Sequence, residues 1–327
     1  MIAYAGALIV GLALLAWSAD RFVEGAAGLA RAMGVSSLII GLTIVAFGTS
    51  APEMLVSAVA AWQGNSGIAV GNAIGSNIAN MALVLGATAL LAPLRVHSRT
   101  LDREFPLMLA VMAAAWALLW NGTLGRLDGL LLLGGMSALV LWTVHLARIS
   151  PPDDPLAAEY SEEIPAAMPP AKAWLLLVSG LLLLLISSKM LVWGAVGVAR
   201  AFGVSDLVIG LTIIAVGTSL PELAASIVAA RKGEDDIAVG NVVGSNLFNI
   251  LAVLGIAGTI GPGKVESLVL VRDFPLMLGL AVTLYLMARG FKRAGEGIIQ
   301  RGSGAVLLAV FLAYQFGLLK ALGSGGG

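Results

Sequence analysis

Apolar residues occur along the chain in ten long runs that are separated by short polar segments. A transmembrane helix needs about 17–25 predominantly apolar residues, and each run reaches that length. The runs are centred near residues 12, 46, 80, 112, 136, 182, 215, 249, 280 and 311. The second, third, seventh and eighth runs are interrupted by Gly, Ser, Asn and Pro. The pattern predicts an all-α polytopic membrane protein with ten transmembrane helices.

The order of residues repeats along the chain at a fixed offset of 169 positions. Residues 34–86, the first copy, match residues 203–255, the second copy, at 32 of 53 positions without a gap. We therefore expect two five-helix repeats, over residues 1–149 and 174–322. Because five is odd, the second repeat should be inverted relative to the first, and inverted repeats place a substrate site near the midplane at their interface.

The composition supports a membrane location and excludes several kinds of function. Hydrophobic residues make up 59% and charged residues 12% of the 327 positions, and the mean hydropathy of +0.96 is far above the range of soluble domains. The formal net charge of zero gives no sign of a nucleic-acid surface. The chain has no cysteine, which excludes disulfides and thiol chemistry, and its two histidines are too separated for a zinc site.

The distribution of basic residues predicts the orientation in the membrane. Of the 19 Lys and Arg residues, 13 fall in the loops after helices 1, 3, 5, 7 and 9, which should be cytoplasmic by the positive-inside rule. Both termini should then lie outside the inner membrane of a prokaryote. Residues 150–173 hold six of the twelve prolines and are interpreted as a solvated cytoplasmic linker, with a regulatory cation-sensing loop as the alternative. Residues 323–327 resemble a flexible linker scar.

A carboxylate behind a proline occurs twice inside apolar runs. Glu53 ends the motif Gly-Thr-Ser-Ala-Pro-Glu, and Glu222 ends the motif Gly-Thr-Ser-Leu-Pro-Glu. A carboxylate at mid-helix in hydrocarbon costs about 2.5–3.5 kcal/mol, and an interior proline costs about 3 kcal/mol more. Two such events in matching segments need a stabilising partner, and we expect that partner to be a bound cation.

Oxygen-bearing side chains surround each glutamate at helical spacing. Thr49 and Ser50 share a helix face with Glu53, and Pro52 leaves the carbonyl of Gly48 without its helical donor. The next helix adds a polar stripe at four-residue spacing. The stripe is Asn72, Ser76 and Asn80, and the second copy repeats the set as Thr218, Ser219, Glu222, Asn241, Ser245 and Asn249. Hard oxygen ligands without sulfur or imidazole favour Na⁺, Ca²⁺ or another hard cation.

Asn72 and Asn241 have two readings that stay open, ion binding or interhelical hydrogen bonding. Beside them, the steps from Gly71 to Gly75 and from Gly240 to Gly244 predict a close approach of a neighbouring helix.

Asp20 and Glu24 are expected near the membrane interface, paired with Arg21 or Arg31.

The motif Gly-Thr-Ser-x-Pro-Glu, followed by Gly-Asn-x-x-Gly-Ser-Asn-x-x-Asn and present twice, strongly resembles the alpha repeats of the sodium/calcium exchanger family. The resemblance implies a monomeric, non-enzymatic antiporter that exchanges several Na⁺ for one Ca²⁺ by alternating access, with no cofactor. It also implies that helices 1 and 6 slide across a rigid core, a motion that the glycine-rich stretches Gly25 to Gly28 and Gly194 to Gly197 would suit.

Site residues follow from the resemblance by motif position. Glu53 and Glu222 would be the Ca²⁺ carboxylates shared with Na⁺, and Thr49 and Thr218 would offer backbone carbonyls to Ca²⁺. The flanking Na⁺ ligands and the central polar positions would be Ser50, Ser219, Ser76, Ser245, the carbonyls of Ala46 and Ala215, and Asn80 and Asn249.

One position departs from the family pattern. Many members carry Asp where this chain has Asn249, so the site has two acids instead of three, which weakens the case for proton coupling.

A Ca²⁺/H⁺ or K⁺-dependent Na⁺/Ca²⁺ antiporter is the alternative in the same class. A cation channel is the alternative in a different class, and an intramembrane protease using the two acids fits least, because no Gly-x-Gly-Asp pattern occurs.

Overall fold

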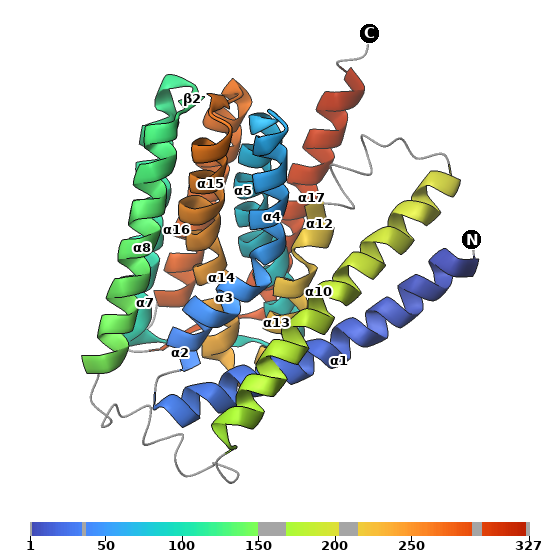
Figure 1. Cartoon of the computed structure of the whole chain (residues 1–327), viewed down its shortest axis with the longest axis vertical. Coiled ribbons are helices and arrows are strands. Elements are labelled where there is room, and N and C mark those ends of the chain that lie inside the picture. The colour runs from blue at the N-terminus through green and yellow to red at the C-terminus, as the bar shows by residue number, and fades with distance from the viewer. Residues whose placement is uncertain (1, 35–36, 150–167, 203–214, 290–295, 325–327) are drawn as a thin grey trace.

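The computed structural model describes residues 2–34, 37–149, 168–202, 215–289 and 296–324, most of them helical (Figure 1). The helices of the first half are α1 (Ile2–Met33), α2 (Ser37–Ile40), α3 (Ala46–Thr49), α4 (Ala51–Trp62), α5 (Ser66–Ala79), α6 (Leu85–Leu91), α7 (Ser98–Leu118) and α8 (Arg126–Ile149). Those of the second half are α10 (Pro170–Ala201), α12 (Ala215–Thr218), α13 (Leu220–Arg231), α14 (Asp235–Phe248), α15 (Leu254–Ile260), α16 (Phe274–Arg289) and α17 (Arg301–Ser324).

Wider and tighter helical turns interrupt these helices. The π-helical turns are η1 (Gly41–Val45), η2 (Asn80–Val84), η5 (Asn249–Val253) and η6 (Val269–Asp273), and a 3-10 turn, η3 (Leu119–Asn121), ends α7. The turns η2 and η5 occupy matching positions of the two copies and begin at Asn80 and Asn249. Such π turns are rare and frequently mark functional sites, and the apolar pattern of the sequence does not distinguish them from α-helix.

Eight described helices are long and apolar enough to cross a membrane, and a bent pair brings the number to nine. The bent pair joins Gly41–Thr49 to Ala51–Trp62 with a 50° break between them. The tenth expected span is centred near residue 215, and its first part falls in residues 203–214, outside the described residues. Most of the expected linker also falls outside them, and α10 begins at Pro170.

Helices α1 and α10 lie side by side and slant across one face of the remaining bundle (Figure 1). Glycines allow this contact, because a Cβ at Gly25 would overlap the backbone of Leu177 and a Cβ at Gly180 would lie 2.6 Å from the nitrogen of Phe22. A side chain at Gly197 would likewise overlap the ring of Tyr4. Gly25 and Gly197 therefore face the partner helix and allow α1 and α10 to pack closely. The expectation that Gly25 to Gly28 and Gly194 to Gly197 suit sliding over the core stays a prediction.

Two short antiparallel ribbons join loops at the ends of the bundle. Strand β1 (Leu94–His97) pairs with β4 (Glu296–Ile299), and β2 (Thr123–Leu124) pairs with β3 (Gly263–Lys264). Each ribbon connects a loop of the first half with a loop of the second half. The sequence pattern did not reveal them, because two- to four-residue strands leave too few alternating positions to recognise.

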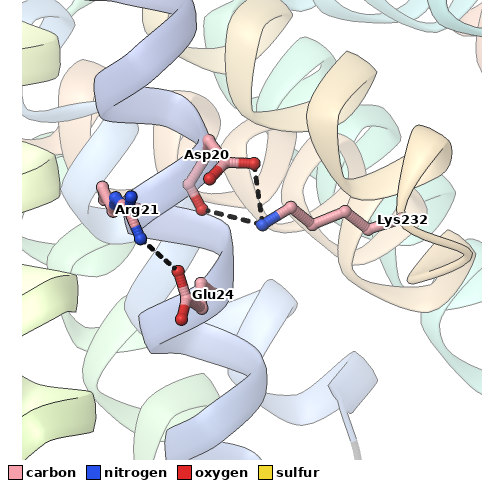
Figure 2. A network of polar contacts seen from close by, with 4 residues as sticks. All are labelled: Asp20, Arg21, Glu24 and Lys232. Atoms are coloured by element: carbon pink, nitrogen blue, oxygen red, sulfur yellow. Dashed lines mark hydrogen bonds and ion pairs between the residues drawn. The ribbon is translucent and has the colours of Figure 1, made fainter.

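Ion pairs connect α1 to the turn after α13. Lys232 Nζ lies 2.8 Å from a carboxylate oxygen of Asp20 and also donates to its backbone carbonyl, while Arg21 pairs with Glu24 at 3.0 Å (Figure 2). The expected pairing of Glu24 with Arg21 is confirmed. The expected partner of Asp20 is wrong, because helix α1 turns Asp20 toward α13, a contact between positions far apart in the sequence.

Candidate cation-binding site

Each Pro-Glu motif lies at a break between two helical segments. Ser50 separates α3 from α4 with φ −82° and ψ 3°, and Ser219 separates α12 from α13 with φ −88° and ψ 5°. Pro52 and Pro221 follow at the start of the new helix, where their missing N–H is tolerated. Glu53 and Glu222 consequently stand in the first turn of a helix, where the helix dipole favours a negative charge.

Hydrogen bonds join the broken helix of the first copy to helices of the second copy. Ser50 Oγ donates to Glu222 Oε1 at 3.1 Å. Thr49 Oγ1 donates to Asn241 Oδ1 at 3.0 Å and lies 3.5 Å from Ser245 Oγ. Oxygens from two segments more than 170 residues apart therefore share one polar cluster, as the repeat predicts.

Asn72 and Asn241 position the helices that carry the glutamates. Asn72 Nδ2 donates to the backbone carbonyl of Glu53 at 3.1 Å and to Ser57 Oγ at 2.9 Å. Asn241 Nδ2 makes the same two bonds, to the carbonyl of Glu222 at 3.3 Å and to Ser226 Oγ at 3.0 Å. Both amides thus donate to helix backbone and serine, so the structure favours the interhelical reading.

Ser57 and Ser226 were missed as site residues. The sequence holds one signal for them: each serine follows the glutamate of its own copy by four residues, so the two serines match in the repeat.

One hydrogen bond between the two copies joins residues that match each other in the repeat. Asn77 Nδ2 donates to the backbone carbonyl of Asn246 at 3.3 Å, and residue 246 is the position that matches residue 77 at the offset of 169. In a two-fold arrangement, only residues near the axis contact their own equivalents. This contact therefore marks where α5 and α14 cross.

The centre of the cluster is buried and rich in oxygens without hydrogen-bond partners among the described residues. Glu53, Glu222, Asn80 and Asn249 are all 0% exposed. The oxygens without a hydrogen bond include both carboxylate oxygens of Glu53, Oε2 of Glu222, Oδ1 of Asn80, Oδ1 of Asn249 and Oγ of Ser219. Buried acceptors cost free energy unless a partner satisfies them, and two carboxylates with neutral oxygens suit a hard cation.

The remaining predicted residues fall around this centre. Ser76 and Ser245 are buried on α5 and α14, and Ala46 is buried at the start of α3. The carbonyl of Ala46 already accepts the amide of Ser50 at 3.0 Å, whereas the amide of Ser219 donates to Val216. Thr218 is partly buried and ends α12. Ala215 is the first residue of the same helix.

The close helix approach expected at the glycine steps is confirmed at Gly244 in the second copy. A Cβ at Gly244 would lie 2.6 Å from the carbonyl oxygen of Leu42 and 2.6 Å from the Cβ of Ala46. A Cβ at Gly71 or Gly75 would meet no described atom within 4 Å. The prediction for Gly71 and Gly75 stays a prediction, because residues 210–214, which match η1 at the repeat offset, lie outside the described residues.

Comparisons with known proteins identify the family. The family model described as "Sodium/calcium exchanger protein" matches residues 3–144 and 172–320. The chain belongs to the sodium/calcium exchanger family. These proteins are membrane transporters and not enzymes.

Individual relatives cover almost the whole exchanger. It is 51% identical to the "Putative antiporter CaxA" of Alkalimonas amylolytica, over 96% of this chain and 98% of the relative. It is 32% identical to the "Sodium/calcium exchanger MaX1" of Methanosarcina acetivorans, over 94% and 96%. A solved structure of the sodium-calcium exchanger NCX_Mj, soaked with Na⁺ and Sr²⁺, matches with a TM-score of 0.82, 32% identity, and 96% and 98% coverage.

One contact in this exchanger links α10 directly to the second broken helix. Ser188 Oγ donates to the carbonyl of Gly217 at 2.9 Å. Pro221 stands four residues after Gly217 and cannot supply the usual helical donor, so Ser188 replaces it. The position that matches Ser188 in α1 is Ala19, which has no hydroxyl. Ser188 carries no distinguishing signal in the sequence, because a serine within an apolar helix is common.

Proposed function

We propose that this protein is a secondary active antiporter that exchanges Na⁺ for Ca²⁺ by alternating access. One observation carries the proposal. Two fully buried carboxylates, Glu53 and Glu222, come from matching broken helices and stand in one cluster of oxygen atoms. Two carboxylates neutralise one Ca²⁺, and the uncharged complex can pass a low-dielectric barrier more readily than a charged one.

In this proposal, Glu53 and Glu222 bind Ca²⁺ together with backbone carbonyls of Thr49 and Thr218, and release it when Na⁺ binds. The Na⁺ ions use the hydroxyls of Ser50, Ser76, Ser219 and Ser245 and the carbonyls of Ala46 and Ala215, with Asn80 and Asn249 at the centre. The buried positions of these serines and asparagines support the assignment.

The proposed architecture is ten transmembrane helices in two inverted repeats, over residues 1–149 and 174–322, joined by a cytoplasmic linker. The Asn77–Asn246 contact supports an axis between the repeats. Both termini would lie outside a prokaryotic inner membrane, and the monomer would be the functional unit.

Net charge movement would allow the membrane potential to drive Ca²⁺ extrusion. If three Na⁺ enter down a tenfold gradient, they release about 4 kcal/mol. One net charge crossing 100 mV adds about 2.3 kcal/mol. Together these terms support a Ca²⁺ concentration ratio of roughly 10⁴ to 10⁵.

Flux into vesicles tests the coupling ion. In proteoliposomes that contain the purified protein, an imposed Na⁺ gradient should drive uptake of radioactive Ca²⁺, and a pH gradient alone should not. Uptake that ignores Na⁺ but follows the pH gradient would replace this proposal with Ca²⁺/H⁺ antiport. Passive flux without any counter-ion would indicate a channel.

A further inference from the structure

Another buried carboxylate, outside the candidate cation-binding site, faces a cavity. Glu104 lies in the first turns of α7 and is only 6% exposed. It lines a small, partly open cavity together with Thr43 of η1 and Thr143 of α8. The other lining residues are apolar and come from η1, α8 and α14: Leu42, Met136, Leu139, Val140, Leu247 and Phe248.

The polar groups of this cavity offer acceptors. Thr43 Oγ1 donates its hydrogen to the carbonyl of Ile39 at 2.6 Å, and Thr143 Oγ1 donates to the carbonyl of Leu139 at 2.8 Å. A hydroxyl has one hydrogen and two lone pairs, so each threonine has only its lone pairs left for another partner. With the carboxylate of Glu104, the lining presents hard oxygen acceptors, which is the ligand chemistry of hard cations.

The residue of the second half that matches Glu104 is an acid whose carboxylate accepts several hydrogen bonds. Position 273 matches position 104 at the repeat offset. Asp273 accepts two hydrogen bonds from Arg272, at 2.7 and 3.1 Å, and one from the hydroxyl of Tyr314 at 3.1 Å. Within the described residues, Glu104 has one ion pair, to Arg103 Nε at 3.6 Å, beyond good hydrogen-bond length.

Arg103, the ion-pair partner of Glu104, also contacts Trp142 and is half exposed. Its guanidinium lies over the ring of Trp142, 5.2 Å from the ring centroid, and its side chain is 48% exposed. The arginine therefore balances the carboxylate charge only in part, which favours a monovalent ion over a divalent one.

Two of the four segments that line the cavity, η1 and α14, lead directly into segments of the candidate cation-binding site. Thr43 precedes Thr49 by six residues, a rise of roughly 9 Å along a helix, and Phe248 directly precedes Asn249. We propose that this cavity is an accessory site for a hard monovalent cation such as Na⁺, a waypoint between the proposed cytoplasmic surface and the central glutamates. Its role in transport rests on the proposed function, but the binding of a cation there does not.

Thallous ion provides the binding test, because Tl⁺ substitutes for alkali cations and scatters anomalously. Crystals soaked in Tl⁺ should show a peak beside Glu104 in the unaltered protein and in the double variant Glu53→Gln/Glu222→Gln. The peak should vanish in Glu104→Gln and persist in Glu24→Gln, which removes an acid that does not line the cavity. No peak in the cavity, or a peak that survives Glu104→Gln, would overturn the proposal. If Glu104→Gln does not fold, Thr143→Val should weaken the peak, and an unchanged peak would count against the site.

Sided transport measurements test the waypoint role. In proteoliposomes of uniform orientation, Glu104→Gln should raise the half-saturating Na⁺ concentration roughly fivefold on the side that the cavity faces. It should leave that concentration unchanged on the opposite side and leave the maximal rate unchanged. A shift that is equal on both sides, or no shift, would reject the waypoint. If the unaltered protein shows no Na⁺-coupled flux, the proposed function fails, while the Tl⁺ experiment still decides whether the cavity binds a cation.

Discussion

The two copies of the repeat share their motif residues, and the structure describes one of their two matching contacts in full. We name the contact of η1 and α3 with α14 the closed interface. We name the face of α5 at Gly71 and Gly75 the open interface; residues 210–214, which match η1, lie outside the described residues. At the closed interface, the backbone of Leu42 approaches Gly244 so closely that no side chain would fit. At the open interface, Gly75 has open space among the described residues.

The polar contacts differ in the same sense. Across the closed interface, Thr49 reaches Asn241 and Ser245, and Ser50 donates to Glu222. In the matching position of the other copy, Ser219 Oγ has no hydrogen-bond partner within the described residues. Under the proposed alternating access, an inverted repeat held in one of two access states would show equal sequences in unequal surroundings. Exchanging the two environments would then give the opposite state.

Loss of either glutamate should have the largest effect, because both copies need their acid. Glu53→Gln and Glu222→Gln keep the size of the side chain and remove its charge. We expect each variant to lower Na⁺-driven Ca²⁺ uptake at least about 100-fold, since removing one charged partner of a buried ion costs about 3–5 kcal/mol. Thermal unfolding in detergent should remain cooperative. Full uptake by both variants would reject the site.

Substitution of alanine for the two matched glycines should change the free energy of unfolding differently at the closed and the open interface. Gly244→Ala places a methyl group against the backbone of Leu42, so we expect destabilisation by about 1–3 kcal/mol. Gly75→Ala meets open space and should be neutral or stabilising by about 0.4–1 kcal/mol. Chemical or thermal unfolding of the two purified variants measures the difference. Equal effects would show that the two interfaces are alike in the membrane protein as isolated.

The two positioning asparagines should differ by one hydrogen bond. Asn241 donates to Glu222 and Ser226 and accepts from Thr49, whereas Asn72 makes only the two donor contacts that the structure shows. We expect Asn241→Ala to reduce the free energy of unfolding by about 1 kcal/mol more than Asn72→Ala. The same unfolding experiment applies, and a larger loss for Asn72→Ala would contradict the account.

Removing the hydroxyl of Ser188 should have the smallest effect and should act on the access equilibrium. The bond to the Gly217 carbonyl is worth about 0.5–1.5 kcal/mol, which corresponds to a roughly two- to twelvefold shift between states. Because the chain has no native cysteine, Gly75→Cys provides a single thiol at the open interface. Its labelling rate should change within that range in Ser188→Ala. An unchanged rate would remove Ser188 from the mechanism.

The sequence predicted the features that follow from local patterns. Apolar runs predicted the helices, and the two Pro-Glu motifs predicted breaks that the structure places at Ser50 and Ser219. The repeat predicted that oxygens of both copies would meet, as Ser50 and Glu222 do.

Contacts that depend on how whole helices are placed could not be predicted. The pairing of Asp20 with Lys232 joins residues from separate halves. The packing of Gly25 and Gly180 between α1 and α10 depends on the slant of those helices. The packing of Gly244 against Leu42 depends on how η1 lies on α14, which the sequence at Gly244 does not reveal.

Anomalous scattering from Sr²⁺ or Ca²⁺ in crystals of this protein tests the central claim most directly. The account predicts one strong peak within about 2.3–2.6 Å of carboxylate oxygens from both Glu53 and Glu222, and its loss in either glutamine variant. A peak held by one glutamate alone, or a peak that survives both substitutions, would contradict the claim that the two halves bind the ion together.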